Sequence, residues 1–216
     1  MTDFDKDKYI YYFRIVLCVI GWISIILGLI NVGINLNGND AVAAYSNYFS
    51  YFTNQTNLMI DIWLTIAIIY ANKENKPKIL GSISHGAITL YITVTFLIFA
   101  IVLAPGYVPQ GLAIYTNSVN HYILPIAFIG EWVITESKNK YEWLYDVYWI
   151  SYPILYVIYS LIRGAVTDFY PYSFIDLTVI SVIDLTVTII VFVIFFLLLG
   201  AIYIFVNRTL NRRKNA

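Results

Sequence analysis

Residues 47–61 read NYFSYFTNQTNLMID, and the polar side chains of this run must find partners elsewhere in the fold. It lies in an apolar segment long enough to cross a membrane, yet polar side chains recur along it. If the run is wound as a helix at about 100° per residue, the polar positions share one face. That face consists of Asn47, Ser50, Thr53, Asn54, Asn57 and Asp61. Because hydrocarbon offers no hydrogen-bond partner to amides or to an acid, the face is predicted to be one wall of a buried site.

The composition excludes a soluble domain, because 60% of the 216 residues are hydrophobic and only 12% are charged. Apolar segments of about membrane-spanning length follow one another, separated by short loops of turn composition. There are six such segments, at about 10–34, 47–71, 80–104, 115–135, 144–163 and 178–206. We therefore expect a single all-α domain over residues 1–216, a polytopic membrane protein with six transmembrane helices.

Basic residues occur in alternate connections between these segments. Lysine and arginine precede the first segment or lie near its start, then follow the second, fourth and sixth segments, whereas the other three loops contain none. The positive-inside rule then predicts that both termini are cytoplasmic. The residues concerned are Lys6, Lys8, Arg14, Lys73, Lys76, Lys78, Lys138, Lys140, Arg208, Arg212, Arg213 and Lys214. A short basic tail beside a membrane indicates topology and lipid contact, so the bilayer and not a nucleic acid is the predicted partner.

Two candidate site residues are predicted at matching depth. Thr53 lies about six residues, or ~9 Å, below the outer end of the second segment, and His121 lies equally deep in the fourth. Pro125 cannot donate a hydrogen bond to the carbonyl of His121, so the helix is expected to bend there. The alternative role for His121 is that of a hydrogen-bonded packing residue. His85 begins a helix at the cytoplasmic side and is too shallow to meet Thr53.

The fifth segment carries a stripe of tyrosines at steps of three and four that ends in Arg163. Such a stripe either packs against another helix or lines a pocket. Arg163 favours the pocket, since a guanidinium can hold a carboxylate, although it can also pair with a nearby aspartate. Asp184 is the acid best placed to reach the same outer layer, whereas Asp61 and Glu131 lie deeper, as structural acids or as parts of a proton path. The tyrosines are Tyr145, Tyr148, Tyr152, Tyr156 and Tyr159.

The sequence predicts neither a metal site nor a cofactor. The two histidines lie at different depths, and neither has an acid at helical spacing that would complete a ligand set. Cys18 is the single cysteine, so no disulfide can form within the chain. Motifs typical of serine hydrolases, zinc proteases and nucleotide-binding loops are absent.

Several short motifs together resemble a known family. They read YFT at 51–53, NL at 57–58, NH at 120–121, YPILY at 152–156, LIRG at 161–164 and YPYSF at 170–174. In these motifs the chain resembles the bacterial branch of the androgen-induced and androgen-dependent six-helix membrane proteins, from the second segment to the start of the sixth. The eukaryotic members hydrolyse fatty-acid esters of hydroxy fatty acids with a threonine nucleophile and a histidine base. The resemblance implies a location in a bacterial plasma membrane.

Carried over residue by residue, the family threonine falls on Thr53 and the family histidine on His121. The resemblance thus implies that Thr53 attacks an ester carbonyl of a lipid-like substrate after His121 takes its proton. A second hypothesis is a non-enzymatic binder or transporter of a small amphiphile, whose head group the same side chains would hold. The candidate oxyanion and substrate-binding residues in either case are Asn54, Asn57, Asn120, Tyr152, Tyr156, Arg163 and Asp184.

Overall fold

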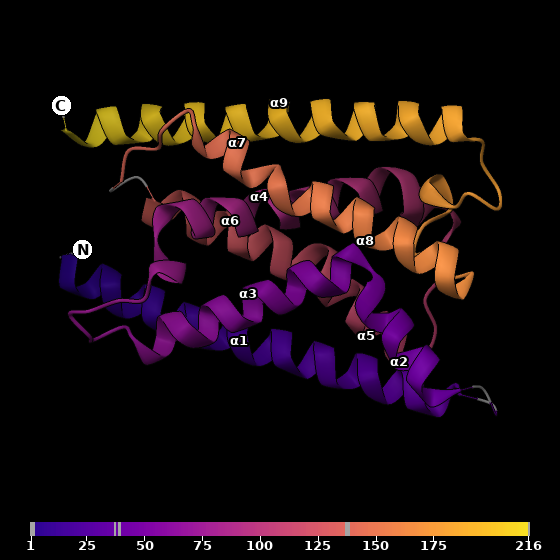
Figure 1. Cartoon of the computed structure of the whole chain (residues 1–216). Helices are drawn as coiled ribbons and strands as arrows, with labels where there is room; N and C mark the ends of the chain where they lie inside the picture. Colours follow the sequence, from indigo (N-terminus) through magenta and orange to yellow (C-terminus); the bar gives the residue numbers. More distant parts are fainter. Residues whose placement is uncertain (1–2, 37, 39, 137–138, 216) are drawn as a thin grey trace.

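The computed structural model describes the backbone of residues 3–36, 38, 40–136 and 139–215, and side chains within residues 7–212 of these ranges. Helices make up most of this part of the chain, and it contains no strand, which confirms the predicted all-α class. Long helices run side by side along one axis, and α1 begins at the end of the bundle where α9 ends (Figure 1). Lys6, Lys138, Arg213 and Lys214 lie outside the described side chains.

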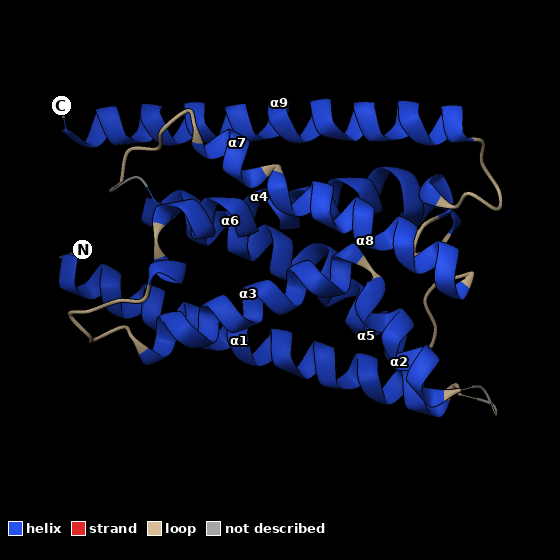
Figure 2. Ribbon diagram, in the orientation of Figure 1, coloured by secondary structure: helices blue, strands red, loops and turns tan. Residues whose placement is uncertain are grey.

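The helices follow one another with short connections, as Figure 2 shows. The α-helices are α1 Asp3–Ile34, α2 Ala41–Ser50, α3 Phe52–Ile69, α4 Ser82–Ile98, α5 Leu112–Ser118, α6 Leu124–Thr135, α7 Tyr145–Trp149, α8 Ser151–Thr167 and α9 Val182–Asn215. Two π turns, η2 Phe99–Leu103 and η4 Val119–Ile123, continue α4 and join α5 to α6. Short 3-10 turns lie at Lys78–Leu80, Ala104–Gly106 and Ser173–Ile175.

Four helical stretches within the described residues are long and apolar enough to cross a membrane, rather than the six expected; the second and fourth segments are the two that do not meet this description. The second segment is broken at Tyr51, whose extended backbone (φ −73°, ψ 132°) separates helices of 10 and 18 residues. The fourth carries Asn120, His121 and Glu131, polar side chains that make it less apolar than a typical span. The four spans are Asp7–Ile34, Ser82–Gly106, Tyr145–Thr167 and Val182–Arg212.

Helix α4 is the central helix of the bundle. In the most apolar part of Ser82–Gly106, the span that begins with α4, half of the residues are buried, against 33% in α1 and 22% in each of the spans in α7–α8 and α9. It contacts α3, α6 and α9, and Figure 1 shows it between them. A fully buried apolar cluster including Ile60, Leu64, Ile92, Leu124 and Phe128 joins α3, α4 and α6. The two polar segments are therefore packed inside, against helices that present apolar side chains outward.

The two π turns have the same origin in the sequence. Each ends two residues before a proline, at Pro105 and at Pro125. Proline has no N–H, and its ring displaces the carbonyl four residues back, so the hydrogen bonds just before it shift to wider spacing. Leu124 N–H accordingly bonds to the Val119 carbonyl, and the carbonyl of Asn120 is left free for another donor. Where the sequence predicted a bend at His121, the structure has a π turn.

Candidate functional site

The break between α2 and α3 is held by a tyrosine from α8. The Tyr156 hydroxyl donates to the carbonyl of Ser50 at 3.0 Å and accepts the N–H of Phe52 at 3.2 Å. It therefore supplies both partners that a continuous helix through Tyr51 would otherwise have provided. The break is stabilised by tertiary structure, because a side chain from another helix satisfies the backbone groups that the break exposes.

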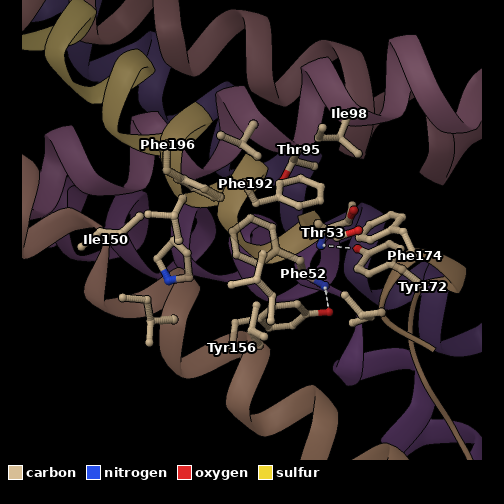
Figure 3. A pocket seen from close by; sticks show the side chains of 18 of the residues that line it. Phe52, Thr53, Thr95, Ile98, Ile150, Tyr156, Tyr172, Phe174, Phe192 and Phe196 are labelled. Carbon is tan, nitrogen blue, oxygen red and sulfur yellow. Dashed lines mark hydrogen bonds between the residues drawn. The ribbon is translucent and has the colours of Figure 1, made fainter. Parts of the chain in front are cut away.

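Thr53 follows in the first turn of α3, and a second phenol holds its backbone. The hydroxyl of Tyr172, from the connection between α8 and α9, accepts the N–H of Thr53 at 3.4 Å. Figure 3 shows the Thr53 and Tyr172 side chains next to each other on one side of a cavity, with the ring of Phe174 stacked on that of Tyr172. The first turn of α3 is therefore fixed by side chains that come from α8 and the loop after it.

Thr53 lines two cavities of opposite character, which also share Phe99, Leu103 and Tyr172. The first has a volume of about 260 Å³ and lies among α4, α8 and α9. Two of its hydroxyls are satisfied within the protein: Thr95 bonds to Thr56 at 3.0 Å, and Tyr156 bonds as described above. Thr53, Tyr172 and Thr188 add three more hydroxyls to the wall, and Thr188 has no side-chain hydrogen bond to another described residue. The rest of its wall is aliphatic or aromatic and includes Val94, Ile98, Leu161, Phe192, Val193 and Phe196. We call it the apolar cavity.

The second cavity has a volume of about 630 Å³, and its wall combines amides, hydroxyls and an imidazole with apolar side chains such as Phe99, Val102 and Leu103. We call it the polar cavity. His121 lines it together with Thr53, so the two residues predicted at equal depth share one cavity. The polar side chains of its wall include Tyr48, Asn54, Thr116, Asn117, Asn120 and His121.

No hydrogen bond joins Thr53 to His121 in the part of the chain that the structure describes. The imidazole instead stacks on the ring of Phe99, with centroids 3.6 Å apart and planes at 15°. Its Nδ1 is buried and has no hydrogen-bond partner among the described residues. His121 is thus held by its ring face, and a ring nitrogen remains available to another group.

Asn57 ties the turn that carries Thr53 to the turn that carries His121. Its side chain is fully buried, and Nδ2 donates to the carbonyl of Thr53 at 2.8 Å and to that of Asn120 at 3.1 Å. The second acceptor is the carbonyl that the π turn leaves free. Because both Nδ2 hydrogens have acceptors, the structure does not support the prediction that Asn57 is an oxyanion donor. It acts as a bridge between α3 and η4.

The other two candidate oxyanion residues line the polar cavity. Asn54 donates to the carbonyl of Tyr48 at 2.7 Å, and the Oδ1 of Asn120 accepts a hydrogen bond from Ser24 at 2.7 Å. This bond uses only the acceptor of Asn120, and no acceptor among the described residues takes its Nδ2 hydrogens. Asn120, directly before His121, is therefore the better-placed donor of the two.

The tyrosine stripe is divided between α7 and α8. Tyr152, Tyr156 and Tyr159 of α8 contact α2 and α3, and Tyr156 also lines the apolar cavity. In α7, Tyr145 packs on Tyr141 and Tyr148 is exposed. Arg163, expected at the substrate site, lies in a separate groove beside Tyr45 and Phe49. Its guanidinium donates to Asn47 and forms no ion pair among the described residues. The contacts of the stripe are Tyr152 to Gln55 at 2.7 Å, Tyr159 with Ser50 at 2.9 Å and Arg163 to Asn47 at 2.6 Å.

Asp184 lies outside both cavities. Its Oδ2 accepts hydrogen bonds from the N–H and the hydroxyl of Ser181, at 3.2 and 2.7 Å, at the exposed start of α9. A carboxylate at a helix N-terminus satisfies free N–H groups and opposes the helix dipole. The expectation of an acid in the substrate layer is replaced by this capping role, which the spacing Ser181 to Asp184 could have indicated.

A buried ion cluster lies away from these cavities. Glu131 pairs with Arg14, whose Nε donates to it at 2.9 Å, and with His85 Nε2 at 2.8 Å. His85 Nδ1 also forms a hydrogen bond with Glu136 Oε1 at 2.9 Å, and the indole of Trp63 stacks on the imidazole. The cluster joins α1, α4 and α6, which gives Glu131 and His85 a structural role. Sequence reasoning missed it because the partners are far apart in the chain.

Tyr172 is the other contact that the sequence did not indicate. It lies in the YPYSF motif, yet a loop position carries no periodicity that would aim it at Thr53.

No protein-family model, curated protein or solved structure matches this chain. The fold and the site define a helical membrane protein with a polar cavity beside Thr53 and His121.

Proposed function

We propose that the protein is an intramembrane hydrolase that cleaves an ester in a lipid-like substrate, with Thr53 as nucleophile and His121 as general base. One observation carries the proposal: Thr53 lies where an apolar and a polar cavity meet, and His121 lines the polar one. An amphiphile spanning both cavities would place the ester bond between its apolar chain and its polar head group beside the Thr53 hydroxyl. The family resemblance supports the same two residues.

The reaction begins when a nitrogen of His121 takes the proton of the Thr53 hydroxyl. Thr53 then attacks the ester carbonyl, and water later hydrolyses the acyl-threonine. The Nδ1 atom has no competing hydrogen bond from the described residues, which suits a base. The two side chains must come within hydrogen-bond reach once substrate is bound, since catalytic hydrogen bonds are commonly long in free enzymes.

The oxyanion that forms on the carbonyl needs donors in the same cavity. We assign this role to the Nδ2 group of Asn120, because its Oδ1 is fixed by Ser24 and its amide hydrogens have no acceptor among the described residues. One such donor contributes ~3–4 kcal/mol to transition-state stabilisation in better-known hydrolases. The N–H of Thr53 is less suited, since it faces the hydroxyl of Tyr172.

We further propose that the second and fourth segments also lie within the bilayer, giving six passes with both termini in the cytoplasm. Their polar side chains contact α1, α4 and α8 or line the cavities, so lipid need not contact them. The basic residues support this orientation. It sets the cavities in the outer half of a bacterial plasma membrane, where substrate would enter from the outer leaflet.

A second candidate is a binder or transporter of a small amphiphile. Two observations favour it: no hydrogen bond joins Thr53 to His121 within the described residues, and the helices around the cavities are interrupted at Tyr51 and at both π turns. Interrupted helices at a buried site are typical of transporters. Under this reading Thr53 binds a head group and no covalent intermediate forms.

Labelling with a fluorophosphonate probe separates the two candidates. Membranes containing the intact chain should be labelled, and Thr53→Ala should lose the label. Thr116→Ala, which removes a hydroxyl from the same polar cavity, is the control and should retain it. If ester hydrolysis is detected, Thr53→Ala, His121→Ala and the double variant should lose similar activity, since nucleophile and base act as one unit. Equal labelling of the intact chain and Thr53→Ala would refute the nucleophile assignment.

A further inference from the structure

The two cavities that meet at Thr53 differ in what they offer a ligand. In the apolar cavity the hydroxyls of Thr95 and Tyr156 are satisfied by Thr56 and by the backbone of α2 and α3. A ligand there finds mainly aliphatic and aromatic side chains, and Thr188 offers one hydroxyl without a partner among the described residues. A polar head group placed in this cavity would lose its hydration with little compensation, whereas an alkyl chain gains about 0.8 kcal/mol per buried methylene.

The polar cavity offers free hydrogen-bonding groups. The amide of Asn117 makes no hydrogen bond to another described residue, and Nδ2 of Asn120 has no acceptor among them. Asparagine side chains both donate and accept, so they suit a ligand rich in hydroxyl groups. An alkyl chain placed here would leave these amides without partners, at a cost of about 1–3 kcal/mol for each group fully removed from water.

The place of His121 decides which arm of the ester enters which cavity. His121 lines the polar cavity and does not line the apolar one. A group that protonates the leaving alcohol must stand beside the leaving oxygen. The alcohol therefore departs into the polar cavity, and the chain of the acyl group extends into the apolar cavity.

We infer that the substrate is a single-chain ester, in which one long acyl chain is joined to a small polyhydroxylated alcohol. The inference rests on the proposed hydrolase function and adds the substrate class to it. It differs from the family's known substrates, which carry long chains on both sides of the ester bond. It assigns Val193 and Leu161, which line the apolar cavity, to the selection of acyl-chain length.

The steps balance without a cofactor. Thr53 Oγ1 forms a bond to the acyl carbon, His121 accepts the hydroxyl proton, and the bond from the acyl carbon to the alcohol oxygen breaks as that oxygen takes the proton from His121. Water from the polar cavity then adds to the acyl-threonine and gives a proton to His121. The bond to Thr53 breaks, Thr53 regains a proton, and a free fatty acid leaves.

Three esters test the assignment with the purified full-length chain in detergent micelles. Monopalmitoyl glycerol has the inferred arrangement, hexadecyl hydrogen succinate reverses it by placing the long chain on the alcohol, and hexadecyl palmitate has long chains on both sides. Acid release is measured with the intact chain and with Thr53→Ala. We expect Thr53-dependent turnover with kcat/KM at least about tenfold higher for monopalmitoyl glycerol than for either other ester.

A pair of neighbouring substitutions on α9 tests the apolar cavity. Val193→Phe narrows it, whereas Ile194→Phe adds the same ring on the outward face, where Ile194 is 51% exposed. Val193→Phe should lower kcat/KM for monopalmitoyl glycerol about tenfold or more and leave monobutyryl glycerol within about threefold, because only the long chain needs the lost volume. Ile194→Phe should change neither. Leu161→Phe, with exposed Ile162→Phe as its control, repeats the test on α8 if Val193→Phe fails to fold.

The possible results distinguish failure of the substrate assignment from failure of the proposed hydrolase function. If Thr53-dependent hydrolysis is faster with hexadecyl hydrogen succinate or with hexadecyl palmitate, the substrate assignment is wrong but the proposed hydrolase function is retained. The substrate assignment alone also falls if narrowing variants on α8 and α9 act equally on long and short acyl chains. Absence of Thr53-dependent hydrolysis of all four esters overturns both.

Discussion

Removing the Tyr156 hydroxyl tests whether the break between α2 and α3 is held as described. Tyr156→Phe deletes a donor to the Ser50 carbonyl and an acceptor for the Phe52 N–H while keeping the buried ring. A side-chain hydrogen bond between membrane helices averages about 0.6 kcal/mol, so two give about 1.2 kcal/mol. Both partners are backbone groups left unsatisfied in a buried setting, each at about 1–3 kcal/mol, so we expect a total loss of about 2–6 kcal/mol.

The assay is a denaturant titration of the purified chain in mixed micelles, followed by tryptophan fluorescence. Tyr152→Phe is the matched control on the same helix, because its hydroxyl makes one hydrogen bond, to the side chain of Gln55, which can turn to another partner. It should cost about 0.6 kcal/mol. Equal losses for the two variants would mean that the break needs no support from α8, and the account of Thr53 placement would fail with it.

Three further predictions concern other parts of the fold. Glu131→Gln leaves the buried ion cluster without its central charge and should lower the unfolding free energy by about 3–5 kcal/mol; a loss below about 1 kcal/mol would show that the cluster is not a structural joint. Arg163→Lys should lower thermal stability slightly through the contact with Asn47 and leave KM unchanged, whereas a raised KM would return Arg163 to the substrate site. In a cysteine-free background, a cysteine at Gln110 should react with an impermeant reagent outside intact cells and one at Lys76 should not; the reverse pattern would invert the topology.

The irregular backbone of this protein is concentrated around one place. The break at Tyr51 and the π turns η2 and η4 all border the polar cavity, and the rings of Phe99 and His121 stack where the two π turns meet. Each irregularity frees backbone groups that regular helices would use internally. Side chains such as Asn57 then take up those groups across helices, so the interruptions that weaken single helices also join them to one another.

Much of the architecture could be read from the sequence because it depends on local properties. Apolar segments of spanning length predict an all-helical membrane protein, and Pro125 predicts an irregular turn at His121. Helical periodicity places Thr53 on a polar face, and residue counting gives it the depth of His121, which then shares its cavity. These inferences need only helix geometry and the cost of polar groups in hydrocarbon.

The tertiary structure decided what each polar group is used for. Asn57, Arg163 and Asp184 have side chains that suit a ligand, yet they bridge two turns, bind Asn47 and cap α9. Tyr172 comes to Thr53 from a loop. A side chain's role depends on which partners the fold brings within about 3 Å, and residues far apart in sequence supply those partners. The membrane location, the helices and the polar face could be predicted from the sequence, because they depend on near neighbours along the chain. Only the packing of the helices decides which polar residues bridge two turns, which cap a helix and which line an open cavity.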